Sequence, residues 1–235
     1  MGLEQMSNYV LYGTPISPFV RKVEVLLRAG GVSYDFESID IFQMPDWFLE
    51  ISPARRVPVL RDRSVSVDGV AGTISDSSAI CIYLDRKLNA GWFGDNAFDA
   101  GRIASLEEYA DTELAQPLGM RVFRPILLPR IAGQDSDVGT ASRVFKDELP
   151  RHLDYLEETL GNKDFFVGER MSLADIAIGA QLTQLDLVVS TPYDVRWPGL
   201  ARHTQTMKAH AGFVDNLATC RKVLSRLVPQ KVDLT

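Results

Sequence analysis

A serine lies where the first predicted strand of the chain gives way to a helix. Residues 9–23 read YVLYGTPISPFVRKV, and Pro15 and Pro18 cannot donate to a sheet, so the strand has to end near Gly13. Pro18 suits the first position of a helix, and Ser17 before it suits the N-cap. The Ser17 hydroxyl is therefore predicted at the positive end of a helix, where it is a plain cap or helps to hold an anion.

The pair Val57-Pro58 directly precedes the strand residues Val59 and Leu60. A proline at this point fits best when its peptide bond is cis. We expect such a bond to expose the backbone N–H and C=O of Val57, so that an extended peptide ligand could pair with it like a short extra strand. The alternative is an edge-strand proline in an ordinary turn.

Asp76 and Ser77 stand where another strand gives way to a helix, in ISDSSAI. The N–H and hydroxyl of Ser77 can bind a carboxylate, and Asp76 can pair with an ammonium group. Simple N-capping is the alternative. The two roles are compatible, because a capping side chain keeps other lone pairs.

The elements that carry these residues alternate in type from residue 9 to residue 88. Their order is β-α-β-α-β-β-α, with a turn at Asp68-Gly69 and a strand-like piece over 70–74. The last two strands can pair as a hairpin, whereas the first two need a crossover. The sheet is therefore expected to mix parallel and antiparallel neighbours.

After NAGWFGDN no further strand pattern is convincing, and helical spacing dominates. Helices are predicted over 103–114 and 149–160, from a capping box at Ser172 and Asp175, and after Trp197-Pro198. The fold class is thus α/β plus all-α. We expect a small α/β domain over residues 1–88 and an all-helical domain over 95–235.

The composition excludes several classes of function. A formal net charge of -6 and a pI of about 5.1 supply no basic face for nucleic acid. Cys81 and Cys220 are far apart, so we expect neither a disulfide framework nor a metal site, and a reducing, cytoplasmic location is favoured. No apolar run is long enough to suggest a membrane span.

Four segments match one family in their order and spacing: SPFVRKV at 17–23, SPARRVPVL at 52–60, ISDSSAICIYL at 74–84 and FFVGERMSLADIAI at 165–178. Together they resemble the cytosolic glutathione transferase superfamily, of bacterial type and with a serine-class site. The resemblance covers nearly the whole chain. It implies a thioredoxin-like N-terminal domain, a helical C-terminal domain, glutathione as co-substrate and a homodimer.

Within this resemblance Ser17 is the central catalytic candidate, as a donor to the glutathione sulfur. A thiol has a pKa of about 8.5, and each unit of lowering requires about 1.4 kcal/mol. A hydrogen bond to a charged group supplies about 1.5 to 3 kcal/mol, and a helix N-terminus supplies up to about 2 kcal/mol. These two contributions suffice to keep a thiolate at neutral pH. Thr14, nearer the strand end, is the rival for this role.

The resemblance also assigns parts of the tripeptide. Val57 and Pro58 would hold the cysteinyl part, while Asp76 and Ser77 would hold the γ-glutamyl end, with Asp where the family more often has Glu. Arg56 is a candidate for the glycyl carboxylate, and a solvated loop cation is the alternative.

The second substrate is expected between the domains, near the first helix after the linker and a loop LGMRVFRPILLPR over 118–130. Phe19, with Ile16, would form the floor of the site. Tyr109 is the candidate from the helical domain, with core packing as its alternative. The three histidines show no partner pattern and are interpreted as surface or packing residues.

The sequence thus predicts an enzyme that conjugates a glutathione thiolate to a small apolar electrophile. Glutathione-dependent isomerisation, dehalogenation or peroxide reduction are close alternatives. A non-catalytic, transferase-like binding or regulatory module is an alternative of another class.

Overall fold

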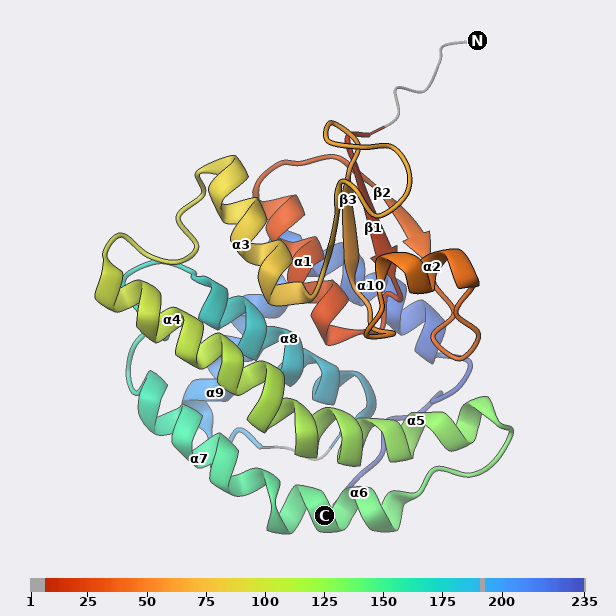
Figure 1. Cartoon of the computed structure of the whole chain (residues 1–235). Helices are drawn as coiled ribbons and strands as arrows, with labels where there is room; N and C mark the ends of the chain where they lie inside the picture. Colours follow the sequence, from red (N-terminus) through yellow and green to blue (C-terminus); the bar gives the residue numbers. More distant parts are fainter. Residues whose placement is uncertain (1–6, 191–192, 235) are drawn as a thin grey trace. The chain divides into compact units, whose positions relative to one another are not determined.

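The computed structural model describes residues 7–190 and 193–234 (Figure 1). The chain divides into two compact units, Met1–Ala90 and Gly91–Thr235. None of the described helices is long and apolar enough to cross a membrane.

The N-terminal unit has the predicted βαβαββα order around a four-stranded sheet. Its elements are β1 (Tyr9–Gly13), α1 (Pro18–Ala29), β2 (Tyr34–Ser38), α2 (Asp46–Ile51), β3 (Val59–Asp62), β4 (Thr73–Ser75) and α3 (Ser77–Leu88). The strand order is β2-β1-β3-β4, with β1 parallel to β2 and antiparallel to β3, and β3 antiparallel to β4. The mixed, thioredoxin-like sheet expected from the sequence is confirmed.

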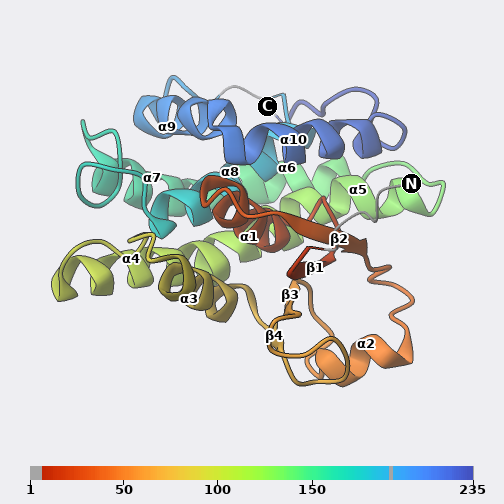
Figure 2. The same cartoon turned by 90° about the horizontal axis from the view of Figure 1, so that it is seen from above.

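Helices cover both faces of this sheet. Views from two directions place α1 and α3 on one face and α2 on the other (Figures 1 and 2). Because side chains alternate along a strand, Val10 and Tyr12 of β1 point to the α2 face, where they pack with Phe48 of α2. Leu11 is fully buried on the opposite face. Apolar burial on both faces fixes the register of the strands.

The connection between β1 and α1 needs a glycine. A Cβ at Gly13 would lie 2.6 Å from Cγ2 of Val20, so a larger residue would push α1 away from the strand. Val20, Val23 and Leu27 of α1 are fully buried at helical spacing, as the sequence pattern indicated. The close approach of α1 to β1 therefore depends on Gly13.

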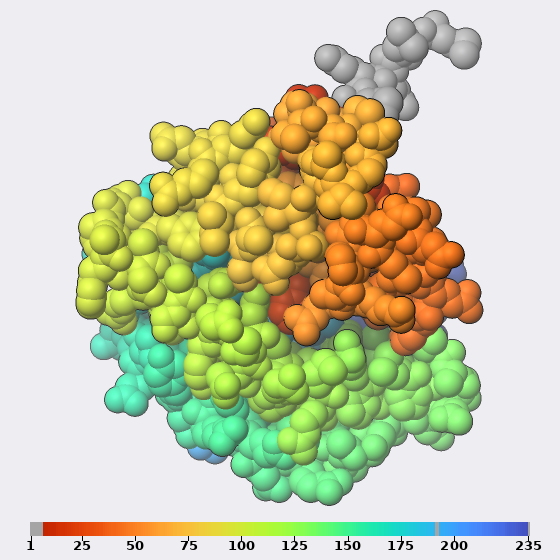
Figure 3. Space-filling model, in the orientation of Figure 1, coloured from red at the N-terminus to blue at the C-terminus, as the bar shows by residue number. Residues whose placement is uncertain are grey.

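The strands β3 and β4 pair antiparallel, which confirms the predicted hairpin, but its second strand is shorter than expected. The second strand is only Thr73–Ser75, whereas residues 63–72 form a loop at the surface of the unit (Figure 3). The buried Arg61 holds this loop by donating to the carbonyl oxygens of Gly69 at 2.8 Å and Ala71 at 3.2 Å. The carbonyl groups of the loop thus bind a buried guanidinium, whereas in a longer strand they would accept backbone hydrogen bonds from β3.

The C-terminal unit consists of helices and loops in its described part, apart from an isolated β-bridge between Val189 and Val232. This confirms the predicted all-helical domain. Its elements are α4 (Ala97–Tyr109), the π-helical segments η1 (Ala110–Leu114) and η2 (Gln116–Phe123), α5 (Arg124–Ile131), α6 (Val138–Asp147), α7 (Leu149–Leu160), α8 (Leu173–Val188), α9 (Pro198–Ala209) and α10 (Ala211–Leu224).

The segment 118–130 is helical, so the predicted loop is wrong. The chain runs without a break from α4 through η1 and η2 into α5. Pro117 and Pro125 lie inside this continuous run, close to the points where the hydrogen-bond pattern changes between α-helix and π-helix. Leu118, Val122 and Ile126 recur at a spacing of four and are fully buried, which is the helical signal that outweighs the prolines.

The buried carboxylate of Asp175 organises the start of α8. It accepts hydrogen bonds from the N–H groups of Phe166 (2.9 Å) and Ser172 (2.8 Å) and from the Ser172 hydroxyl (2.7 Å). The Nε2 of His203 in α9 lies 3.1 Å from Oδ1, the oxygen that also accepts from Phe166. The predicted capping box is therefore one part of a larger network that joins α8, α9 and the preceding loop.

Replacing Asp175 with Ala should lower the free energy of unfolding by about 3 kcal/mol, because several buried donors would lose their charged acceptor. Urea denaturation followed by circular dichroism measures this loss. Asp137→Ala removes the exposed N-cap of α6 and is the matched control. A loss for Asp175→Ala no larger than that of the control would contradict the network's importance.

Candidate functional site

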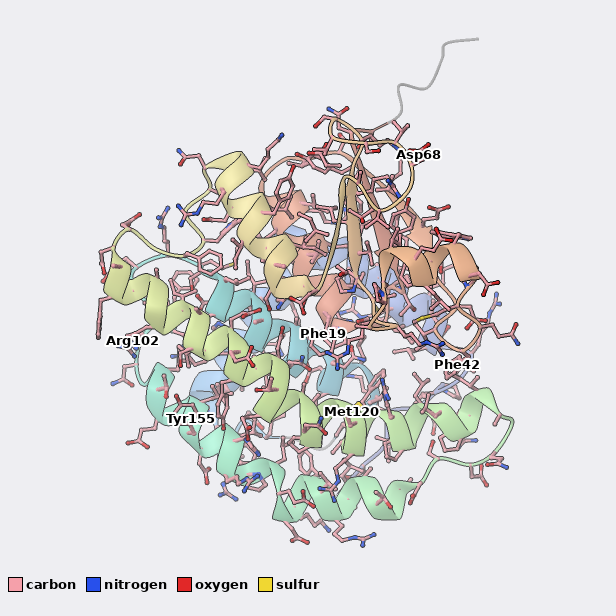
Figure 4. The ribbon with its side chains drawn as sticks, in the orientation of Figure 1. Phe19, Phe42, Asp68, Arg102, Met120 and Tyr155 are labelled. Carbon is pink, nitrogen blue, oxygen red and sulfur yellow. The ribbon has the colours of Figure 1, made fainter. Side chains whose placement is uncertain are left out.

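The register of the sheet brings the three predicted motifs to one end of the N-terminal unit. Tyr12 of β1 pairs with Val59 of β3, and Val59 pairs with Ser75 of β4. The last residues of β1 and β4 therefore flank the first residue of β3. Helices α1 and α3 also begin at this end, while the loop that carries Asp68 lies at the other end, as Phe19 and Asp68 show in Figure 4.

Ser17 is the N-cap of α1. Its Oγ accepts a hydrogen bond from the N–H of Val20 at 3.4 Å, and its backbone C=O accepts from Arg21 at 2.9 Å. Within the described residues the Ser17 hydroxyl donates to no acceptor, and the side chain is half-buried. The cap therefore uses one lone pair of the Ser17 hydroxyl and leaves its proton available.

The two other predicted residues at this turn are Thr14 and Phe19. The backbone C=O of Thr14 accepts from Ser17 N–H at 3.0 Å, which closes the turn between β1 and α1. The Thr14 hydroxyl makes no hydrogen bond to the described residues. Phe19 lies in the first turn of α1 and, like Ile16, is partly exposed (Figure 4). Ser17 thus has apolar neighbours in sequence on both sides.

The peptide bond between Val57 and Pro58 is cis, as the sequence suggested. Val57 is partly exposed, and no hydrogen bond within the described chain uses its backbone. Ser52 fixes the preceding turn, because its Oγ accepts from the N–H of Arg56 at 3.1 Å and donates to the C=O of Arg56 at 2.7 Å. The guanidinium of Arg56 is exposed and makes no ion pair within the described residues.

Asp76 is the N-cap of α3. Its Oδ1 accepts from the N–H groups of Ser78 at 3.0 Å and Ala79 at 3.1 Å, while Oδ2 has no partner in the described chain and the side chain is exposed. Ser77, the first residue of α3, is buried. The backbone of Asp76 has a φ of 91°, a conformation that costs on the order of 1–3 kcal/mol outside glycine. One carboxylate oxygen is thus used for capping and the other points to solvent.

Sequence reasoning missed Lys22. This fully buried cation of α1 donates from Nζ to the Ser78 Oγ at 3.4 Å and so links α1 to the first turn of α3. A lysine in a helix usually indicates a solvated face, so its type and spacing gave no signal.

Two family models match most of the chain. Residues 11–91 match the N-terminal domain of glutathione S-transferase, and residues 107–206 match its C-terminal domain. The chain belongs to the glutathione S-transferase superfamily.

Individual relatives of this glutathione S-transferase family protein are distant. "Glutathione S-transferase DHAR3, chloroplastic" of Arabidopsis thaliana is 27% identical over 177 residues, which are 73% of this chain and 56% of the relative. The chain thus spans little more than half the length of that relative. "FtsZ-localized protein A" of Caulobacter vibrioides is 23% identical over 184 residues, 78% of this chain and 79% of the relative.

A glutathione S-transferase from Rhodospirillum rubrum has a similar crystal structure. Its TM-score is 0.77 at 25% sequence identity, over 89% of this chain and 91% of that chain. The likeness extends through both the thioredoxin-like and the helical parts.

Tyr109, the predicted site residue of the helical unit, is engaged by α7. Its hydroxyl lies 2.8 Å from Nδ1 of His152, and its ring is 4.7 Å from that of Tyr155, which Figure 4 labels on α7. Arg151 donates from Nε to Nε2 of His152 at 3.0 Å. A neutral His152 must therefore carry its proton on Nδ1 and donate it to Tyr109. Packing, the alternative interpretation of Tyr109, accounts for these contacts.

The histidines have partners that the sequence pattern did not reveal. His152 joins Tyr109, His203 joins Asp175, and the Nδ1 of His210 accepts from Gly212 N–H at 3.1 Å to cap α10. The partners of His152 and His203 lie on other helices, so no local spacing indicated them, whereas His210 caps its own helix.

His152 should make the protein less stable as the pH falls. Burial, reinforced by Arg151, lowers the pKa of its imidazole below the ordinary value of about 6.5. The unfolded chain then binds a proton that the folded chain does not, so stability is lost as the pH falls below about 6.5 towards the folded pKa. In His152→Asn the drop in the urea midpoint between pH 7.5 and pH 5.5 should be smaller than in the wild type. An unchanged drop would contradict this assignment.

Proposed function

We propose that this protein is a glutathione transferase of the serine type, which holds a glutathione thiolate and directs it at small apolar electrophiles. The observation that carries the proposal is the Ser17 hydroxyl, which sits at the start of α1 with its acceptor side bonded to Val20 and its proton uncommitted. Family membership supports glutathione as the thiol.

The energetics suit thiolate stabilisation. A hydrogen bond from Ser17 to a charged sulfur contributes about 1.5 to 3 kcal/mol, and the N-terminus of α1 adds up to about 2 kcal/mol. Their sum reaches about 5 kcal/mol at most, and the cost of lowering a thiol pKa by two units, about 2.7 kcal/mol, lies within that range. Ser17 keeps its proton throughout, because it acts as a donor. The sulfur lone pair then forms the new bond to the electrophile.

The same sheet end offers partners for the rest of the tripeptide. The unpaired backbone of Val57, before Pro58, can bind the cysteinyl amide as an added strand. The free Oδ2 of Asp76 can accept from the γ-glutamyl ammonium, and the start of α3 at Ser77 can receive the adjacent carboxylate. The unpaired guanidinium of Arg56 is our candidate for the glycyl carboxylate.

The proposal also covers the second substrate, the location and the oligomeric state. Phe19 and Ile16, both partly exposed, give Ser17 an apolar surround that suits an apolar electrophile. We propose a cytoplasmic homodimer. Tyr109 is the weakest of the proposed substrate contacts, because His152 already binds its hydroxyl.

Ser17→Ala should reduce kcat/KM with glutathione and an aryl halide by about 10- to 100-fold, since one hydrogen bond to the thiolate is lost. Spectroscopic titration of bound glutathione should show a raised thiol pKa. Thr14→Ala, the matched control at the same turn, should change kcat/KM by less than about threefold.

Ser17→Asp separates capping from catalysis. It keeps an acceptor for Val20 N–H, so its unfolding midpoint should stay near that of the wild type, but its charge repels a thiolate. A larger loss in Thr14→Ala than in Ser17→Ala would transfer the role to Thr14. An active Ser17→Asp would refute the donor mechanism.

Asp76→Asn should weaken the binding of glutathione by about tenfold or more, because the amide keeps the cap but loses the charge that pairs with the ammonium. Isothermal titration calorimetry measures the affinity. Asp68→Asn makes the same charge change at the opposite end of the sheet and should leave the affinity as it is. Equal effects of the two variants would show that overall charge, not this contact, is responsible.

A second candidate is a non-catalytic module of the same fold. The likeness to FtsZ-localized protein A, whose name describes a location with another protein, favours it. Such a module would bind glutathione without turnover. Glutathione binding in calorimetry, together with no activity towards any electrophile, would support this candidate. Isomerisation, dehalogenation and peroxide reduction use the same thiolate and are separated by substrate profiling.

A further inference from the structure

A cavity of about 100 Å³ lies in the C-terminal unit where α8, α9 and α10 meet the end of the chain. The helices α9 and α10 follow one another along one side of this unit (Figure 2). The lining residues include Asp186, Leu187, Lys208, Leu217, Arg221 and Lys231. One water molecule needs about 10–15 Å³ of such volume, so the cavity accommodates a group of several heavy atoms.

The residues that line the cavity carry more positive than negative charges. Asp186 is the one acidic residue among the described residues of the lining, and its Oδ2 lies 2.7 Å from the Nζ of Lys208. The other oxygen, Oδ1, accepts from the Tyr193 hydroxyl at 3.3 Å. Lys208 therefore neutralises the carboxylate, and two further cations line the same space.

Those two cations are Arg221 and Lys231, which have no ion pair or side-chain hydrogen bond within 7–190 and 193–234. Both residues are exposed, and two neighbouring cations without a counter-ion beside one small cavity create a local, salt-screened positive potential in a protein of net charge -6. Such a potential attracts an anion.

Hydrogen bonds of the neighbouring residues hold the backbone next to Lys231, whose side chain is exposed. The N–H of Val232 donates to Val188 C=O at 2.8 Å, and the C=O of Val232 accepts from Ser190 N–H at 2.9 Å. The C=O of Leu234, a fully buried residue, accepts from the Ser142 hydroxyl at 2.9 Å. The final segment thus binds to the end of α8 and sets Lys231 at the cavity.

We propose that this cavity binds a small oxyanion, the phosphate group of inorganic phosphate or of a phosphate monoester. The guanidinium of Arg221 offers two donors to neighbouring oxygens, and the ammonium groups of Lys231 and Lys208 serve the others. A phosphate with two negative charges matches the two unpaired cations, whereas a carboxylate matches only one. Leu187 and Leu217 provide an apolar wall for the carbon part of an ester. This inference is independent of the glutathione site.

Calorimetric titration of the full chain at constant ionic strength tests the proposal, with inorganic phosphate, glycerol phosphate and acetate as probes. Phosphate should give saturable heat, and Arg221→Gln and Lys231→Gln should each raise its Kd by about tenfold. Lys222→Gln removes a charge from the next residue of α10, which does not line the cavity, and should change Kd by less than about twofold. Ser17→Ala should bind phosphate like the wild type.

Several results would overturn the site. These are no saturable heat with either phosphate probe, an unchanged Kd in folded Arg221→Gln, a loss in Lys222→Gln equal to that in Arg221→Gln, or acetate binding as tightly as phosphate. Tighter binding of glycerol phosphate than of inorganic phosphate would support a monoester ligand. The reverse order would support the free anion. Circular dichroism of each variant verifies its fold.

Discussion

The pairing of Tyr12, Val59 and Ser75 across three neighbouring strands is the constraint on which the candidate site depends. Because β3 runs antiparallel to both β1 and β4, its first residue lies beside the last residues of the other two. This arrangement gathers Ser17, Val57 and Asp76, which are separated by up to 59 positions in the chain, at one end of a sheet. A slip of one residue would turn the buried side chains of these strands towards the wrong face, so the packing that stabilises the sheet also preserves the site.

The two helices that start at this end are capped by the residues proposed to bind the ligand. Ser17 and Asp76 each accept hydrogen bonds from free N–H groups of their helix and keep one further function, a hydroxyl proton or a second carboxylate oxygen. Helix stability and ligand binding therefore draw on different atoms of the same side chains. The positive φ of Asp76 indicates that its position is imposed by its surroundings against a local preference.

Several predictions failed where distant parts of the chain supply the partners. The predicted hairpin forms with a shorter second strand, because Arg61 binds the carbonyl groups of the loop before it. A buried apolar face keeps residues 118–130 helical despite their prolines. In the sequence Lys22 and His152 look like ordinary polar residues, yet each is buried and forms a hydrogen bond to a residue of another helix. The residue type alone could not distinguish a solvated lysine or histidine from one that bridges two elements.

The sequence by itself determined the order of elements in the N-terminal unit, the start of α1 at Pro18, the capping box at Ser172 and the family, because propensities, caps and apolar spacing act within a few residues. Only the tertiary structure decided which atoms of Ser17 and Asp76 stay available, how Tyr109 is turned to α7, and that Arg221 and Lys231 share a cavity. These properties depend on the register of strands and the packing of helices, which join residues far apart in the chain and leave no local pattern.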